Sequence, residues 1–142
     1  MDELIPSQLN LREEHLAEIV AIVSKNAPYE SCGILAGDHH SSQKVYLIQN
    51  TLQAHNEYLM DAEEMLAAFW DIEEKGWEVL AFFHSHPSSP PIPSPTDLAR
   101  NFYPHTIHAI IGKTGSEWKM KAYQLFNHHY NEIPIVLIST RV

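Results

Sequence analysis

The chain has 142 residues, 44% of them apolar and 19% charged, a balance typical of one globular domain rather than a disordered chain. A net charge of −9 argues against nucleic acid as a partner, because proteins that bind phosphate backbones usually present a basic face. The one cysteine, Cys32, cannot form an internal disulfide, and no apolar run approaches the roughly 20 residues of a membrane helix. Residues 1–7 show no signal-peptide pattern, so we expect a cytoplasmic protein with no membrane partner.

The first half of the chain predicts two helices and two strands. Apolar side chains recur at helical spacing over residues 11–26 and predict a helix. A short apolar run at 33–37 and alternating side chains at 44–49 predict two strands. Asp61 has the character of an N-cap with acidic residues after it, which predicts a second helix over 61–75.

The second half predicts four strands and one short helix. An apolar run at 79–83 predicts a strand that leads directly into His84-Ser85-His86-Pro87. Five prolines over residues 87–95 predict a stiff, irregular loop, and Ser94 then resembles the N-cap of a helix. Further strands are predicted at 106–111, 118–126 and 133–138. Because strands and helices interleave, the pattern favours a mixed sheet covered by helices.

Two histidines and an aspartate form the candidate metal site. His84 and His86 are two residues apart where a predicted strand ends, so both imidazoles point to the same face. The proline-rich loop can bring Asp97 back as a third ligand. A hydrolytic zinc site uses three protein ligands and leaves a fourth position open for water. These residues therefore predict a zinc hydrolase.

The segments around these residues resemble a known family. His84-Ser85-His86-Pro87, six further residues and then Ser94-Pro95-Thr96-Asp97 are similar to the metal signature of the JAMM (MPN-domain) metalloproteases. Upstream, residues 29–37 resemble the glutamate segment of that family, and residues 58–64 resemble the lead-in to its central helix. The similarity runs from about Leu9 to Phe126. The chain is identified on this ground as resembling a small prokaryotic-type member.

The resemblance implies a role for each residue of the site. It implies that His84, His86 and Asp97 hold one zinc ion together with a water. It implies that Glu30 is the general base and acid. Ser94 would stabilise the developing oxyanion with its hydroxyl group. The physical chemistry agrees, because a carboxylate beside a zinc site can take a proton from water and return it to the leaving amine.

The resemblance also implies a fold, an activity and a partner. The expected fold is a single domain over residues 1–142, a three-layer α/β/α arrangement with a mixed, curved central sheet of the cytidine-deaminase-like type. The expected activity is that of a deubiquitinase-like isopeptidase or peptidase. It would cleave after the C-terminal Gly-Gly of a ubiquitin-like or sulfur-carrier protein. A homodimer is left open.

Simpler interpretations exist for the same residues. Helix capping alone explains Ser94 and Asp97, and a solvated loop acid is the default for Glu30. Cys32 is expected to be a small buried apolar residue rather than a nucleophile. Four aromatic residues are expected in the core: Trp70, Trp77, Phe82 and Phe83.

Other functions remain to be weighed against the peptidase. A zinc deaminase of the nucleoside type needs a Pro-Cys-x-x-Cys segment, which a chain with one cysteine lacks. A nonhaem iron oxygenase also uses two histidines and a carboxylate, but its acid usually stands two residues after the first histidine, where this chain has His86. Two alternatives stay open. One is a scaffold domain that is catalytically silent, and the other is a zinc hydrolase of small amide adducts in sulfur or cysteine metabolism.

Overall fold

A central six-stranded sheet between two helices forms the body of the protein. The computed structural model describes residues 6–100 and 103–139. In chain order the elements are β1 (Leu9–Arg12), α1 (Glu13–Asn26), β2 (Cys32–Gly37), β3 (Ser42–Ile48), α2 (Ala62–Glu74), β4 (Glu78–His86), α3 (Pro95–Ala99), β5 (Ile107–Thr114), β6 (Glu117–Phe126), β7 (His129–Ile133) and β8 (Ile135–Ile138). The strand order in the large sheet is β3-β2-β4-β5-β6-β7.

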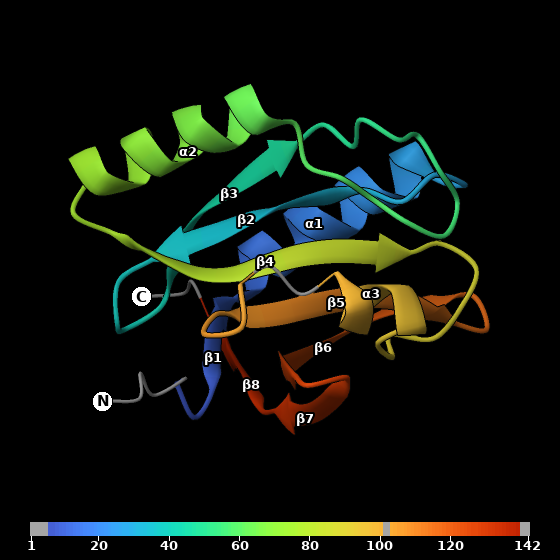
Figure 1. Ribbon diagram of the computed structural model, residues 1–142. Coiled ribbons are helices and arrows are strands. Elements are labelled where there is room, and N and C mark those ends of the chain that lie inside the picture. Colours follow the sequence, from blue (N-terminus) through green and yellow to red (C-terminus); the bar gives the residue numbers. More distant parts are fainter. Residues whose placement is uncertain (1–5, 101–102, 140–142) are drawn as a thin grey trace.

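The two long helices cover opposite faces of this sheet (Figure 1). Successive side chains of a strand point to opposite faces, and β4 follows this rule with two adjacent phenylalanines. Phe83 is fully buried in the cluster that contains Ile19 of α1. Phe82 packs in the other cluster, which contains Ile72 of α2. The predicted three-layer α/β/α arrangement is therefore confirmed.

The sheet is mixed, as predicted, and its one parallel pair positions the site. β4 and β5 run parallel, with His86 opposite Gly112, whereas the other pairs in the large sheet are antiparallel. Parallel neighbours need a crossover connection, and here residues 87–106 supply it with α3 inside. The carboxyl ends of β4 and β5 therefore meet at one edge, and the crossover returns over that edge.

A small second sheet corrects two sequence predictions. The helix predicted over 11–26 begins at Glu13, because Leu9 and Leu11 alternate with half-buried neighbours and form β1. β1 pairs in parallel with β8. The strand predicted over 133–138 is two strands that belong to different sheets. Pro134 separates them, since proline has no N–H group to continue a ladder.

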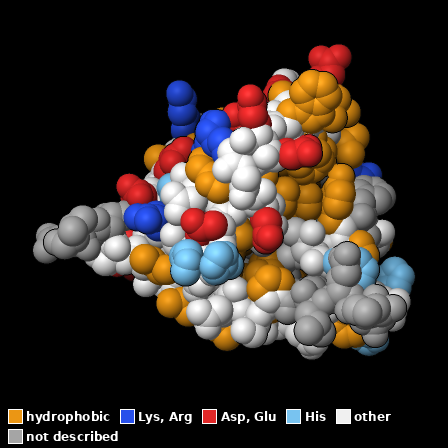
Figure 2. All heavy atoms as spheres, turned by 90° about the vertical axis from the view of Figure 1, so that its left-hand side faces the viewer, with side chains coloured by type: hydrophobic (Ala, Val, Ile, Leu, Met, Phe, Trp, Pro, Cys, Tyr) orange, Lys and Arg blue, Asp and Glu red, His pale blue; other side chains and the backbone are white. Residues whose placement is uncertain are grey.

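The predicted aromatic core is correct for β4 and wrong for α2. Phe82 and Phe83 are buried. Trp77 is partly buried and packs against the cluster that contains Ile72 of α2. Trp70, however, is 70% exposed, and Leu66 one turn before it is 54% exposed. Both side chains lie off the stripe that faces the sheet, whose buried members are Ala68 and Ile72. Figure 2 shows hydrophobic side chains gathered at the top of one face, at the height of α2.

Cys32 is buried as predicted, with its thiol donating to the carbonyl of Ile48. Burial raises the pKa of this thiol to about 12, so it carries no thiolate at neutral pH. Within residues 6–100 and 103–139, no helix is long and apolar enough to cross a membrane.

Truncation of the two aromatic side chains should separate the core from the exposed flank of α2. We expect Phe83→Ala to lower the free energy of unfolding by about 3–5 kcal/mol, because it leaves a cavity in the α1 layer. Trp70→Ala should change it by less than about 0.5 kcal/mol. Urea unfolding curves with equal slopes would measure both values. Equal losses for the two variants would contradict this description of the core.

Candidate metal centre

The end of β4 brings two histidines into a buried position. His84 is 1% exposed and His86 is 6% exposed, and both belong to the last, fully buried part of the strand. Ser85 between them points to the opposite face. Its hydroxyl accepts a hydrogen bond from the N–H of Ser31 at 2.8 Å, and its own N–H donates to the carbonyl of Ser31 at 2.9 Å. Strand β4 is therefore tied at this point to the segment that carries Glu30.

Asp97 reaches the same place through the cap of α3. The Ser94 hydroxyl accepts a hydrogen bond from the N–H of Asp97, and the Asp97 carboxylate accepts one from the N–H of Ser94 at 2.9 Å. This reciprocal pattern is a capping box, with Pro95 at the start of the helix. The cap fixes the carboxylate so that it faces the end of β4. The cap leaves the Asp97 carboxylate facing the two histidines, so the simpler interpretation does not compete with the predicted metal site.

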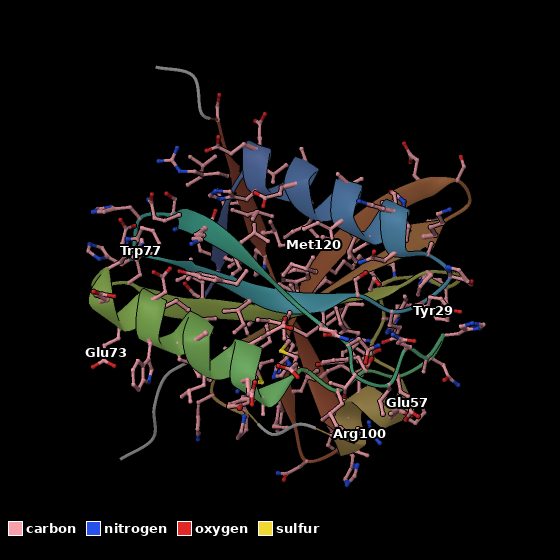
Figure 3. All side chains as sticks on the ribbon, turned by 90° about the horizontal axis from the view of Figure 1, so that it is seen from above. Tyr29, Glu57, Glu73, Trp77, Arg100 and Met120 are labelled. Carbon is pink, nitrogen blue, oxygen red and sulfur yellow. The ribbon has the colours of Figure 1, made fainter. Side chains whose placement is uncertain are left out.

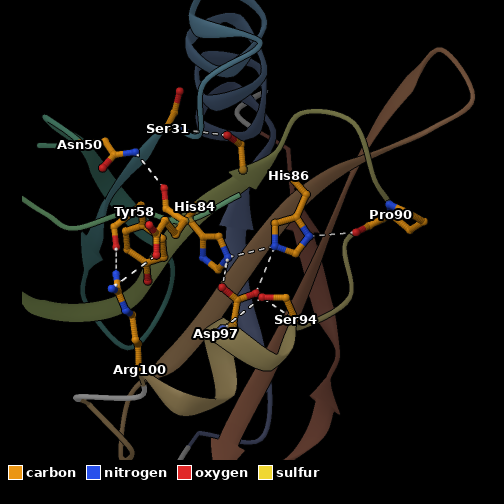
Figure 4. Close-up of polar contacts among 11 residues, drawn as sticks. Ser31, Asn50, Tyr58, His84, His86, Pro90, Ser94, Asp97 and Arg100 are labelled. Carbon is orange, nitrogen blue, oxygen red and sulfur yellow. Dashed lines mark hydrogen bonds and ion pairs between the residues drawn. The ribbon is translucent and has the colours of Figure 1, made fainter. Parts of the chain in front are cut away.

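The three side chains converge at ligand distances (Figure 4). The Nε2 atoms of His84 and His86 lie 3.2 Å apart. Oδ1 of Asp97 lies 3.0 Å from Nε2 of His84, and Oδ2 of Asp97 lies 3.1 Å from Nε2 of His86. With ligand bonds of about 2.0–2.1 Å, the edges of a tetrahedral zinc site are roughly 3.3 Å long. The group His84, His86 and Asp97 therefore could hold a metal ion, as the sequence predicted.

A backbone carbonyl orients one of these imidazoles. Nδ1 of His86 lies 3.1 Å from the carbonyl oxygen of Pro90, which can only accept, so Nδ1 carries the proton and Nε2 faces the site. The loop comes this close because Gly112 has no side chain. A Cβ atom there would lie 2.5 Å from the Ser89 carbonyl. The absence of a side chain at Gly112 therefore allows the turn after β4 to pack against β5.

The charges of the group are strongly coupled. Burial alone would raise the pKa of Asp97, but the hydrogen bond and charge interaction with His84, and the hydrogen bonds from His86 and the N–H of Ser94, hold it well below its usual range. Burial lowers the pKa of His84. Burial acts in the same direction on His86, yet Asp97 and the Pro90 carbonyl raise its pKa overall. A cation binds these atoms when the carboxylate is ionised and both imidazoles are neutral.

Glu30 lies just before β2 and is buried, not solvated. Its side chain is 5% exposed, and Oε1 has no hydrogen-bond partner among the described residues. Burial raises the pKa of Glu30 to about 8, with Asp97 and Glu57 adding to the effect and His86 opposing it. The interpretation of Glu30 as an ordinary solvated loop acid is therefore wrong. A buried carboxylate coupled to His86 and Asp97 is in the electrostatic reach of the metal group.

An aromatic ring and a cavity lie beside the metal-binding group. The ring of Tyr58 stacks on His84, with centroids 4.5 Å apart and planes inclined by 24° (Figure 4). Beside Asp97 lies a cavity of about 180 Å³, mostly apolar and lined also by Met60, Phe82 and Tyr103. Tyr58 begins the segment that resembles the lead-in to the family's central helix, but the sequence predicted no role for it. No spacing rule predicts such a contact, because 26 residues separate the two rings along the chain.

With this fold and this site, the chain belongs to a known family. It matches the prokaryotic homologs of the JAB domain over residues 12–126, which is most of its length. The predicted family is therefore confirmed. The match ends with β6, so β7 and β8 lie outside it.

Three curated relatives carry informative names. A desampylase of Pyrococcus furiosus is 41% identical over 92 residues, which are 65% of this chain and 65% of the relative. A Thermus thermophilus protein named as a TtuB-protein conjugate cleaving protease is 33% identical, over 68% of this chain and 67% of its own. A CysO-cysteine peptidase of Mycobacterium tuberculosis is 22% identical, over 92% and 91% of the two chains. The match thus spans slightly less than two thirds of the Pyrococcus protein.

Solved structures share the fold. A protein from Desulfitobacterium hafniense superposes with a TM-score of 0.83 at 29% identity, covering 92% of this chain and 93% of that one. A JAB1/MPN domain protein from Archaeoglobus fulgidus gives a TM-score of 0.58 at 18% identity, covering 92% and 100%. At that identity the second likeness concerns the fold alone, and it agrees with the predicted MPN-type architecture.

Because Glu30 is buried, we predict that the free energy of unfolding of the metal-free protein depends on pH. Below pH 4.5 Glu30 is protonated in the folded and unfolded states; above it the unfolded chain releases the proton while the folded chain retains it up to about pH 8. Stability should therefore fall as pH rises through this window. Glu30→Gln removes the loss, so its melting temperature should match wild type near pH 4.5 and exceed it near pH 8.5 by on the order of 5 °C.

Calorimetry of the metal-free proteins across this pH range would measure the difference. Glu117→Gln is the matched control, because Glu117 is exposed on β6. Parallel curves for wild type and Glu30→Gln would contradict the assignment of Glu30 as a buried, destabilising acid.

Proposed function

We propose that this protein is a zinc metallopeptidase that cleaves the amide bond after the C-terminal Gly-Gly of a ubiquitin-like or sulfur-carrier protein. The observation that carries the proposal is the buried group of His84, His86 and Asp97. Membership of the JAB family supports it. So do the relatives, whose names describe a protease that cleaves a protein conjugate and a peptidase for CysO-cysteine. The predicted activity agrees with these names.

The choice of zinc follows from the donor set. Two imidazole nitrogens and one carboxylate leave a fourth tetrahedral position open, an arrangement found in hydrolytic zinc sites and not in closed structural ones. A zinc ion bound here would lower the pKa of water towards 7 and polarise the scissile carbonyl. His84, His86 and Asp97 would hold it. The same donors also suit iron, so metal analysis is part of the test.

The residues of the chain supply the proton transfers. Glu30 would take a proton from the attacking water and then give it to the leaving amine, a general base and acid role worth about 100- to 10,000-fold. Its raised pKa suits this role, because a carboxyl group that titrates near neutral pH can hold a proton and also release it.

Ser94 is proposed to stabilise the negative charge that develops on the substrate. Its oxygen accepts the hydrogen bond of the α3 cap, so its own hydroxyl hydrogen stays available as a donor. We propose that it donates to the developing oxyanion. Loss of one such donor typically costs about 100- to 1,000-fold in rate. A substrate end made of glycines suits the site, since a tail without side chains can enter beside Asp97 without displacing Tyr58.

A test of this function compares four samples with a ubiquitin-like protein that carries a short extension after Gly-Gly. We expect wild-type protein with zinc to cleave at Gly-Gly. Glu30→Gln should retain zinc and lose at least about 100-fold in rate, because it keeps the ligands and removes the base. Chelated wild type should be inactive and recover on addition of zinc. Glu117→Gln, a change in an exposed acid, should behave as wild type.

Two outcomes would contradict the proposal. Cleavage by Glu30→Gln at the wild-type rate would exclude the proposed base. A zinc-loaded wild type with no activity on any carrier, and with a partner complex unaffected by Glu30→Gln, would favour the scaffold alternative instead.

A carrier attached to a single amino acid is a second candidate substrate. The relative named CysO-cysteine peptidase favours it, and that match extends over 92% of this chain. The two substrates share the Gly-Gly end and differ in the leaving group. Parallel rates on a carrier–lysine isopeptide and on a carrier–cysteine adduct would decide which leaving group the site prefers.

Three further expectations stay predictions. They are the cytoplasmic location, the homodimer and the single domain over residues 1–142. The ends of that range, residues 1–5 and 140–142, lie outside the described residues.

A further inference from the structure

The segment between β3 and α2, residues 50–60, links the buried acid to the metal-binding strand. It contains Asn50 at its start and Tyr58 near its end. Asn50 is 9% exposed, which is unusual for an amide side chain in a connecting segment. Such burial requires that its polar atoms be paired.

The side chain of Asn50 makes four hydrogen bonds, two as donor and two as acceptor. Its Nδ2 donates to the carbonyl of Glu30 at 3.1 Å and to the carbonyl of Glu57 at 3.3 Å. Its Oδ1 accepts from the N–H of Leu52 at 3.1 Å and from the N–H of Leu59 at 3.0 Å. One side chain thus closes the segment on itself and binds it to the backbone of Glu30.

The backbone N–H and carbonyl of Glu30 both form hydrogen bonds with this segment. The N–H of Glu30 donates to the carbonyl of Ala54 at 2.9 Å, and its carbonyl accepts from Asn50. The next residue, Ser31, is bonded twice to Ser85 between the two histidines. Glu30 therefore sits between two supports, the 50–60 segment and strand β4.

The other end of the segment lies against the metal group. Asn50 binds the residues on both sides of Tyr58, whose ring stacks on His84. Arg100, just after α3, holds the same stretch from outside. Its guanidinium lies 3.4 Å from the Glu57 carboxylate and donates to the Tyr58 carbonyl at 3.5 Å, and Figure 3 shows Arg100 beside Glu57.

We propose that Asn50 is a positioning residue for catalysis, which fixes Glu30 relative to the metal-binding group by holding Glu30 and the Tyr58 stretch at once. The inference rests on the proposed function, since it concerns the base of that reaction. Only an amide side chain combines two N–H donors with an oxygen acceptor at this length. Asn50→Asp keeps the acceptor for Leu52 and Leu59 but removes the donors to Glu30 and Glu57.

The chain offers a matched control in the neighbouring residue. The hydroxyl of Thr51 donates to the carbonyl of Leu59 at 3.1 Å, so it closes the same segment, and among the described residues no hydrogen bond joins it to Glu30. Thr51→Ala should loosen the segment alone. Asn50→Ala and Asn50→Asp should loosen the segment and release Glu30.

Hydrogen exchange measured by mass spectrometry tests this coupling without reference to activity. We expect both Asn50 variants to speed exchange in peptides that cover residues 28–33 and in peptides that cover 50–60. Thr51→Ala should speed exchange mainly in 50–60, because it leaves the hydrogen bond from Asn50 to the Glu30 carbonyl in place. If Asn50→Ala does not fold, Asn50→Asp decides the result. Unchanged protection over residues 28–33 in a folded Asn50 variant would overturn the proposal.

Kinetics on the Gly-Gly substrate provide the second readout. A displaced base should lower kcat by about 10- to 100-fold and leave KM within about twofold, because misplacement of a reacting group affects the chemical step. Thr51→Ala should keep kcat near wild type. An unchanged kcat, or a rise in KM alone, would overturn the proposal. Lack of cleavage by wild type would contradict the proposed function instead, while the exchange result would still decide whether Asn50 holds Glu30.

Discussion

The burial of two imidazoles and a carboxylate at one edge of the sheet is the constraint on which the rest of the site depends. Polar groups removed from water need partners, and these three find them mainly in one another, at 3.0–3.2 Å. The arrangement requires the parallel pair of β4 and β5, whose crossover returns α3 to the end of β4. It also requires Gly112, which lets the turn approach closely enough to orient His86.

The electrostatics indicate what this edge is built to hold. Glu30 and Asp97 bring two carboxyl groups into one buried region of a chain whose net charge is already −9. Burial raises the pKa of Glu30, and the charges of Asp97 and Glu57 add to this effect. A bound divalent ion would offset the charge of Asp97 and favour the ionised form of Glu30. Glu30 lies just before β2 and outside its hydrogen-bond ladder. The 50–60 segment binds the backbone N–H and carbonyl of Glu30 instead.

Much of the site could be predicted from local patterns, and the rest could not. The period of two in a strand predicted that His84 and His86 share a face, and the proline-rich loop was predicted to bring Asp97 back to them. Glu30 was found through the family resemblance alone, because its burial arises from segments distant in sequence. Asn50 was missed for the same reason, since its partners are backbone groups of Glu30, Glu57 and Leu59. In the fold, β1 was not predicted, because its four residues carry too short a pattern, and its second half was included in a predicted helix. Trp70 was assigned to the core on hydrophobicity alone, although it lies off the buried stripe of α2.

The most direct test of the central claim is a crystal structure of zinc-loaded protein with anomalous data collected on both sides of the zinc absorption edge. We expect one strong anomalous peak, at about 2.0–2.2 Å from Nε2 of His84, Nε2 of His86 and a carboxylate oxygen of Asp97. This peak should disappear below the edge. A peak elsewhere in the protein, or no peak at these three side chains when zinc is in excess, would show that they are not the zinc ligands.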